Sequence, residues 1–315
     1  MRMLALASML VAVPALGQSW PSKPVRMVLA LGGGAEVAAR AIGERLGASL
    51  GQPVVVEAMA GAGGAVGAET VARAAPDGHT ILLATPNTHV YRPYIVKSMS
   101  YDPVKDFTPV GKIVETTICI VSSTSFPVSS LAELIDYARK NPGKLSYGTT
   151  GIGTGHHLNL EQIMALTGVN IVHVPYKGGN QQTQDLVGGQ IPAGSTILAT
   201  VASQVKAGKL RILAVYGANR YKAIPDVPTV AEVIPGFQGL SGWMGYFGPA
   251  GMPQPIVQRR VGKDGPDVRV EALQGKLEGI GFVVDLGSPA GLADLVKRDL
   301  AVAGNMAKRA GIKPE

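Results

Sequence analysis

The chain has 315 residues, of which 46% are hydrophobic and 16% are charged, a composition typical of a globular protein rather than a disordered one. The formal net charge is +7, and the basic residues are scattered without runs or interleaved aromatic residues. This pattern argues against nucleic acid as a partner and favours small anions. Cys119 is the only cysteine, which excludes a disulfide framework and a cysteine-based metal site; its apolar surroundings predict a buried, inert thiol.

The first predicted element is a signal peptide over residues 1–17. Arg2 supplies the positive start, residues 4–13 form an apolar run, and residues 15–17 give a small-x-small cleavage signal. The run is shorter than the ~20 residues that span a membrane, and no later stretch is long enough. We therefore expect an exported, periplasmic protein that is cleaved near Gly17. Loss of Arg2 lowers the net charge to +6.

Strands and helices alternate after the signal peptide. Strands are predicted at 25–31, 53–58 and 79–85, with a helix at 35–51 and a glycine turn and helix over 61–78. This order predicts a parallel sheet covered by helices. The alternation repeats, with strands at 117–123, 144–150, 170–176 and 211–217 and helices at 129–143, 156–168 and 180–190. An extended return segment at 242–253 and helices around 270–281 and 289–311 complete the chain.

The repeated alternation predicts two α/β lobes joined by paired crossing strands, because no linker-like stretch separates the halves. We expect one crossing around residues 118–123 and the other around 216–228. The predicted divisions are the signal peptide at 1–17, lobe 1 at 18–120 together with 223–315, and lobe 2 at 121–222.

Three glycine-rich turns come after strands and at or just before helices. A helix N-terminus exposes unpaired N–H groups and a partial positive charge, so it attracts anions. Glycine lets the backbone approach such a ligand closely. Three such turns at the carboxyl ends of strands predict an anion site between the lobes. The turns are Gly32, Gly33 and Gly34; Gly61, Ala62, Gly63 and Gly64; and residues 148–155.

Other kinds of site fit these turns poorly. Residues 61–67 lack the third glycine and the later acidic residue of a dinucleotide fingerprint, and no P-loop sequence occurs. His156 and His157 are neighbours that point about 100° apart on a helix, so they cannot share one metal ion. No serine elbow and no carboxylate pair is present. We therefore interpret three hydroxyls as donors around a bound anion: Thr149, Thr150 and Thr154.

A series of sequence blocks occurs in order: "GGGAEVAAR", "GAGGAVGAETVARAAPDGHTILLAT", "YDPVKDFTPVG", "NPGKLSYGTTGIGTGHHLNLE", "VHVPYKGG", "DLVGGQI", "GKLRILAV", "PDVPTVAE" and "WMGYFGPAGMP". Together they closely resemble the periplasmic receptors of tripartite tricarboxylate transporters, also called Bug receptors. The resemblance runs from about Trp20 to the C-terminus and is densest up to about Pro253.

The resemblance implies a type II periplasmic-binding fold, in which two α/β lobes joined by two crossing strands close on a small carboxylate. It also implies delivery of the ligand to membrane permease subunits, without catalysis, metal or cofactor. We expect a monomer. Carried over by position, the ligand contacts are the glycine turns of lobe 1, then Thr149, Thr150, Gly151, Thr154 and His157, then Tyr176 and Gly178, and Thr196 in a segment that faces the cleft.

Several alternatives stay open. Tyr176 and His157 could instead make structural hydrogen bonds between lobe elements. A sensor that presents the bound carboxylate to a membrane signalling partner would use the same pocket, and an enzyme acting through Thr150 and His157 is a further alternative.

The sequence departs from the family pattern at places that bear on the pocket. Glu36 stands where the family usually has Asp, and residues 58–60 replace the usual Asn-Arg-Pro. Pro192 and the Ser195-Thr196 pair replace an Asp and a largely apolar strand, and residues 259–279 match loosely. These changes predict a less acidic pocket with smaller walls, and the identity of the ligand cannot be carried over.

Overall fold

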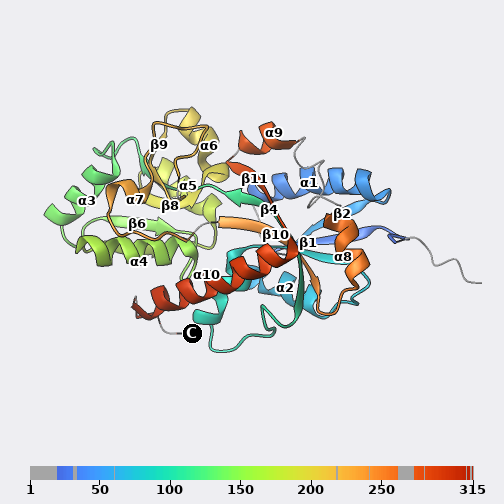
Figure 1. Cartoon of the computed structure of the whole chain (residues 1–315). Coiled ribbons are helices and arrows are strands. Elements are labelled where there is room, and N and C mark those ends of the chain that lie inside the picture. Colours follow the sequence, from blue (N-terminus) through green and yellow to red (C-terminus); the bar gives the residue numbers. More distant parts are fainter. Residues whose placement is uncertain are drawn as a thin grey trace, which may run out of the picture.

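Two mixed sheets, each covered by helices, build the two α/β lobes (Figure 1). This computed structural model describes residues 20–30, 34–59, 61–217, 219–240, 242–261, 273–279, 281–309, 311–312 and 314. The predicted signal peptide and the turn residues Gly32 and Gly33 lie outside them, as does Ala60. We use lobe 1 for the part built on the six-stranded sheet and lobe 2 for the part built on the five-stranded sheet.

The sheet of lobe 1 has the order β11-β4-β10-β3-β1-β2. Strand β1 pairs in parallel with β2 and β3, whereas β10 runs antiparallel to β3 and β4. Met27 of β1 faces one hydrophobic cluster and Val28 faces another, so both sides of the sheet are buried. This explains why the residues of β1 are apolar except for Arg26, which is half-buried and pairs with Glu57 of β2. The strands are β1 (Val25–Leu29), β2 (Val54–Ala58), β3 (Thr80–Ala84), β4 (Phe107–Thr116), β10 (Gly242–Pro249) and β11 (Phe282–Gly287).

Helices cover both faces of this sheet. Ala38, Ile42 and Leu46 repeat every four residues along α1 and bury one side of that helix against Met27. Helices α2 and α10 cover the opposite face, where Val71 and Leu292 are buried. The helices of lobe 1 are α1 (Gly34–Leu50), α2 (Ala65–Ala72), α8 (Gln254–Val261), α9 (Gln274–Glu278) and α10 (Pro289–Arg309).

The sheet of lobe 2 has the order β7-β6-β8-β5-β9, with β5 antiparallel to both neighbours. Cys119 lies in β5, and burial raises the pKa of its thiol to about 12, which confirms the predicted buried thiol. The strands are β5 (Ile118–Ser123), β6 (Ser146–Thr149), β7 (Val172–Pro175), β8 (Ala193–Ile197) and β9 (Leu210–Val215). The helices are α3 (Leu131–Lys140), α4 (Gly155–Thr167), α5 (Gly179–Val187), α6 (Leu198–Lys206) and α7 (Val230–Val233).

The two sheets share one plan. In each, three parallel strands are followed by one antiparallel strand and then a further strand, as β2-β1-β3-β10-β4 and β7-β6-β8-β5-β9. In lobe 1 the strand order changes direction between β1 and β3, so the chain connections on the two sides of this point run toward opposite edges of the sheet. The same change of direction occurs between β6 and β8 in lobe 2. Ligands of open α/β sheets bind at the carboxyl ends of strands at such points. The fold thus places one candidate edge in each lobe.

Two passages connect the lobes within the described residues. Strand β4 leads into β5 through Thr117, whose N–H donates to the Gly281 carbonyl (2.9 Å) and whose carbonyl accepts from the Leu198 N–H (2.8 Å). Gly281, which precedes β11, thus lies beside the first passage. The second passage comes after α7, later than the predicted 216–228, because Val230 and Phe237 are buried in the core of lobe 2.

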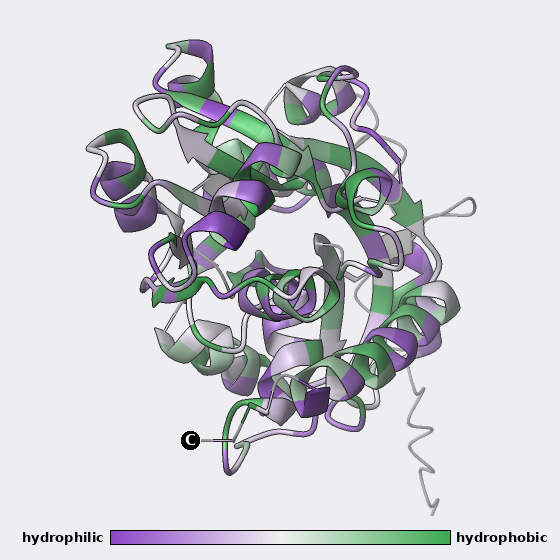
Figure 2. Cartoon of the chain, turned by 90° about the vertical axis from the view of Figure 1, so that its left-hand side faces the viewer, coloured by the Kyte–Doolittle hydropathy of each residue, from purple (hydrophilic) through white to green (hydrophobic). Residues whose placement is uncertain are grey.

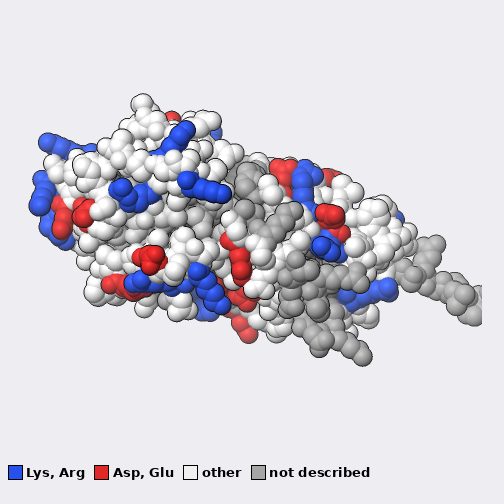
Figure 3. Space-filling view, turned by 90° about the horizontal axis from the view of Figure 1, so that it is seen from above, with Lys and Arg blue, Asp and Glu red and all other residues white. Residues whose placement is uncertain are grey.

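The surface is mixed in character. Hydrophobic residues dominate the strands, while the helices alternate between polar and apolar residues (Figure 2). On the face shown in Figure 3, basic and acidic side chains lie interspersed. Ion pairs of the protein include Arg139–Asp136 (2.6 Å). Within the part of the chain that the structure describes, no helix is both long enough and apolar enough to cross a membrane.

Candidate functional site

The second glycine turn lies at the carboxyl end of β2 and packs against the end of β1. Ala62, Gly63 and Gly64 have φ angles of 51°, 67° and 92°, in the left-handed region. A Cβ on Gly64 would lie 2.4 Å from the Ala30 carbonyl oxygen and 2.8 Å from Thr88 Cγ2. Only glycine permits this approach. Gly64 is therefore explained by packing within lobe 1, and contact with a ligand stays a prediction.

The segment after β3 supplies polar groups that the sequence analysis did not single out. The Thr88 hydroxyl donates to the Thr85 carbonyl (2.9 Å) and lies 2.9 Å from His89 Nδ1. The Thr85 hydroxyl is buried and has no hydrogen-bond partner among the described residues. Burial lowers the pKa of His89 to about 3, so this ring is neutral. The signal that could have found these residues is their position, because they follow a parallel strand at its carboxyl end.

Arg92 lies over the second glycine turn and was also missed. Its Nη1 donates to the Ala62 carbonyl (2.6 Å) and lies 3.9 Å from the Cβ position of Gly63. The other guanidinium N–H groups have no hydrogen-bond partner in the described residues. Arg92 therefore brings a positive charge with free donors to this edge of lobe 1, which suits a carboxylate.

In lobe 2, the third turn is held by its own hydrogen bonds. Thr149 is fully buried, and its hydroxyl lies 2.6 Å from His173 Nε2 and 3.3 Å from both N and O of Gly151. The rings of His157 and His173 stack with their centroids 4.0 Å apart. Burial, with a smaller contribution from His157, lowers the pKa of His173 to about 4. Thr149 and Gly151 thus fix the shape of the loop.

The start of α4 is closed by side chains of the same turn. The Thr154 hydroxyl accepts from the His157 N–H (3.5 Å) and donates to the Gly151 carbonyl (2.8 Å). His157 Nδ1 accepts from the Gly153 N–H (3.0 Å), and its Nε2 lies 3.3 Å from Glu161. Both ring nitrogens of His157 are therefore engaged within the protein, which favours the structural alternative for this residue over contact with a ligand. Thr150 differs, because this half-buried residue has no hydrogen-bond partner for its hydroxyl within the described residues.

The start of α5 is arranged in the opposite way. Its N-cap is Gly178, with a φ of 147° and no side-chain cap. Thr196 is fully buried, and its hydroxyl has no hydrogen-bond partner in the described part of the chain. That hydroxyl lies 3.0 Å from the Cβ position of Gly179, the first residue of the helix. Free N–H groups and a free hydroxyl therefore meet at one point, which is the donor set that a carboxylate needs.

Tyr176 joins these elements together. Its hydroxyl donates to Asp185 (2.7 Å), and its backbone N–H donates to the Thr149 carbonyl (2.9 Å). Burial, together with Asp185, raises the pKa of Tyr176 to about 12. Tyr176 therefore ties α5 to the end of β6, and the geometry favours the structural role for it.

A buried polar layer supports both helix starts. Gln182 donates to the carbonyls of Gly148 (2.9 Å) and Ser195 (3.0 Å), and the Ser195 hydroxyl lies 2.9 Å from His156 Nδ1. His156 and His157 thus have different partners. Among the described residues, no group of three or more His, Cys, Asp or Glu side chains could hold a metal ion.

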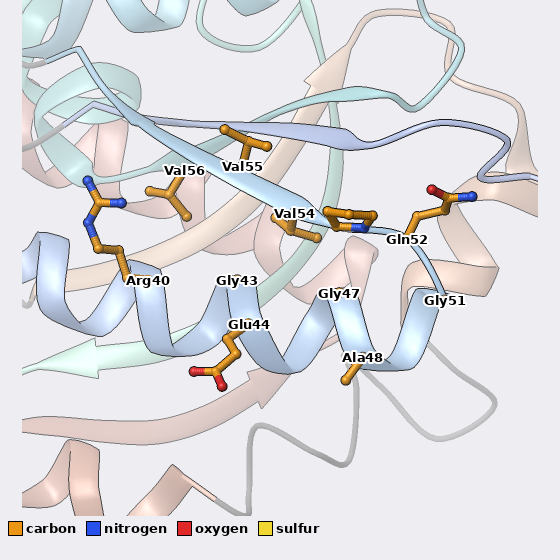
Figure 4. Close-up of a pocket in the computed structure, with 11 residues that line it drawn as sticks. Arg40, Gly43, Glu44, Gly47, Ala48, Gly51, Gln52, Val54, Val55 and Val56 are labelled. Atoms are coloured by element: carbon orange, nitrogen blue, oxygen red, sulfur yellow. The ribbon is translucent and has the colours of Figure 1, made fainter.

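A groove of about 710 Å³ lies away from these turns, between α1 and the free edge of β2 (Figure 4). Gly43 and Gly47 form part of it because α1 packs closely on β2; a Cβ on Gly43 would lie 2.9 Å from Val56 Cγ2. None of the described residues of the three glycine turns lines this groove. We therefore place the candidate site at the carboxyl edges of the two sheets.

Solved structures with the same fold include binding proteins with bound dicarboxylates. R. palustris Rpa4515 with adipate is 33% identical, with a TM-score of 0.85 over 94% of this chain and 100% of that chain. MatC (Rpa3494) from Rhodopseudomonas palustris, with bound malate, is 30% identical, with a TM-score of 0.79 over 91% of this chain and all of its own. The periplasmic binding protein BugD is 32% identical, with a TM-score of 0.81 over 94% of this chain and 100% of that chain. The fold is thus that of the periplasmic binding proteins.

Sequence comparisons agree with the structural ones. Protein BugT of Bordetella pertussis is 32% identical over 251 residues, which cover 78% of this chain and 77% of that protein. Residues 38–310 match the family profile described as "Tripartite tricarboxylate transporter family receptor". These proteins are receptors and not enzymes, and this chain belongs to the tripartite tricarboxylate transporter receptor family.

Proposed function

We propose that this chain is the periplasmic receptor of a tripartite tricarboxylate-type transporter and that it captures a small dicarboxylate between its lobes. In this proposal the signal peptide is cleaved near Gly17, and the mature monomer delivers its ligand to membrane permease subunits. Family membership supports the transport role, and the adipate and malate in two related structures support the class of ligand.

The observation that carries the proposal is the uncapped start of α5. Gly178 and Gly179 leave their backbone N–H groups uncapped by any side chain, and the Thr196 hydroxyl beside them has no other partner among the described residues. A carboxylate bound there would satisfy both. Thr150, with a free hydroxyl on the neighbouring turn, would add a further donor.

Lobe 1 would hold the second carboxylate. Arg92 lies over the glycine turn with unused guanidinium donors, and the buried Thr85 hydroxyl is without a partner within the described residues. A ligand with a carboxylate at each end would thus contact both lobes at once and favour their closed arrangement.

The test is a thermal-shift screen of the chain from residue 18 onward. Adipate and malate are compared with matched monocarboxylates, diamines and neutral diols. A true ligand at 100 times its Kd should stabilise the fold by about 2.7 kcal/mol. Stabilisation by diamines or diols, with no shift for any carboxylate, would contradict the proposal.

A further inference from the structure

The two lobes touch where the third turn of lobe 2 meets the segment after β3. A Cβ on Gly153 would lie 1.9 Å from Ile95 Cγ2. A Cβ on Gly155 would lie 2.7 Å from the Tyr91 hydroxyl and 2.9 Å from Tyr91 Cζ. All three distances are well below van der Waals contact, so any side chain at these two positions would force the lobes apart or displace Ile95 and Tyr91.

Only the contact explains the glycine at position 155. Gly153 has a φ of 70°, a conformation that favours glycine whatever its surroundings. Gly155 is the first residue of α4 and lies outside the left-handed region, so its backbone would accept alanine. Alanine is also the better helix former. What excludes it is the ring of Tyr91.

Helix α4 carries this contact into both hydrophobic cores. Leu158 is fully buried in the lobe 1 cluster that contains Tyr91, whereas Leu160 and Ile163 belong to the core of lobe 2. Helix α4 also contacts α10 of lobe 1. The surfaces that meet are therefore apolar and continuous with packed interior, which makes their separation costly.

We propose that Gly153 and Gly155, with Ile95 and Tyr91 seated on them, form a closure contact that sets how closely the lobes approach. These residues would determine ligand affinity without touching the ligand, because the apparent Kd equals the intrinsic Kd divided by the fraction of closed protein. The effect on affinity rests on the proposed function, but the effect on closure does not.

The experiment measures the distance between the lobes without any ligand. Spin labels are placed by Lys105→Cys in lobe 1, where the side chain is 85% exposed, and by Lys140→Cys at the exposed end of α3 in lobe 2. The native Cys119 is fully buried and out of reach of the label. Pulsed electron paramagnetic resonance of the labelled full chain then gives the distribution of distances between the two labels.

In the parent protein we expect a short-distance component, which represents the closed arrangement of the lobes. Gly155→Ala should abolish this component. The double variant Gly155→Ala with Tyr91→Leu should restore it. Gly275→Ala is the matched control and should leave the distribution unchanged. Gly275 is an exposed helical glycine, and among the described residues no atom beyond its own helix and chain neighbours lies within 4 Å of its Cβ position. A parent protein without the short component, or a Gly155→Ala protein that keeps it, overturns the proposal.

A second arm links closure to binding. For a carboxylate that stabilises the parent protein, Gly155→Ala should raise Kd by the same factor by which it lowers the closed fraction, and Tyr91→Leu should reverse the change. An unchanged Kd beside a lost closed component would overturn the link to affinity. If no carboxylate binds but the distances shift as expected, the proposed ligand class fails while the closure contact stands.

Discussion

Thr196 shows how a single buried hydroxyl can point to function. A buried polar group without a partner costs about 1–3 kcal/mol, so proteins rarely retain one without a use for it. Thr196 is fully buried and lacks a partner among the described residues, yet its hydroxyl lies beside the uncapped start of α5. In contrast, the hydroxyls of Thr149 and Thr154 are already engaged within the protein.

We predict that Thr196→Val weakens carboxylate binding by about 10- to 100-fold, the range expected when a hydrogen bond to a charged group is lost. The free energy of unfolding without ligand should stay the same or rise, because the unpaired hydroxyl is gone. Isothermal titration calorimetry and urea unfolding measure the two effects. Thr167→Val, at the far end of α4, is the control and should leave affinity intact. Equal affinities for the parent and Thr196→Val would remove Thr196 from the site.

The buried histidines predict a pH dependence of stability. Burial lowers the pKa of His156 to about 4, whereas an unfolded chain titrates near 6.5. As pH falls below ~6.5, the unfolded state takes up the proton first, so stability is lost progressively down to about pH 4. His173, with its pKa lowered to about 4, and His89, lowered to about 3, act in the same direction.

His156→Gln should remove one proton from the number taken up on unfolding. The slope of the unfolding free energy against pH should therefore fall by about 1.4 kcal/mol per pH unit in the middle of the range. Urea unfolding at several values between pH 7 and pH 4 measures the slope. The comparison is between slopes, so a constant loss of stability from the broken contact with Ser195 does not affect it. A slope equal to that of the parent would show that His156 does not titrate on unfolding.

At the scale of elements, two helix starts in one lobe differ in what they leave free. Helix α4 is capped by Thr154, and the Gly153 N–H before it is taken by His157, whereas α5 begins after Gly178 with no side-chain cap. The glycine-rich composition of both turns is similar, yet only the start of α5 lacks a side-chain cap. The cap residue, rather than the number of glycines, separates a structural turn from a candidate binding turn.

Thr154→Ala should therefore destabilise the protein by about 1 kcal/mol, the usual cost of losing an N-cap. Thr154→Ser keeps the hydroxyl and should retain most of the stability. Chemical denaturation of both variants measures the difference. If alanine and serine were equally stable, the hydroxyl would not serve as the cap that the geometry shows.

At the scale of the whole molecule, the lobes depend on how the chain between α7 and β10 is held. The Asn159 amide on α4 accepts from the Leu240 N–H (3.0 Å) and donates to the Leu240 carbonyl (3.3 Å). One turn later, Gln162 accepts from the Gln238 N–H (3.0 Å). Helix α4 thus fixes the second passage between the lobes and also carries the third turn.

Asn159→Ala would leave both backbone groups of Leu240 unpaired in a fully buried position, so we expect a loss of about 2–4 kcal/mol in the free energy of unfolding. Gln162→Ala breaks an exposed hydrogen bond in the same segment and should cost well under 1 kcal/mol. Urea unfolding compares the two variants. Similar costs for both would show that burial at Asn159 does not matter.

The sequence predicted the α/β alternation and the receptor family, and the family match confirms the latter. It missed β8 and α6. The segment "IPAGSTILAT" contains one strand and begins one helix, so neither the strand period nor the helix period is visible along its whole length. It also missed Arg92 and Thr85. Their positions near the glycine turns depend on β3 pairing with β1, which local patterns do not specify.

The sequence by itself determined the classes of element, the buried thiol and the family, because these follow from periodicity, composition and ordered motifs. Only the tertiary structure decided which donors are free. Thr149, Thr154 and Tyr176 look like ligand contacts in the sequence, but each hydroxyl is engaged by a neighbour that folding brings to it, such as His173 or Asp185. Thr196 is left without such a neighbour in the described chain, because an unpaired group is a property of packing and not of residue type.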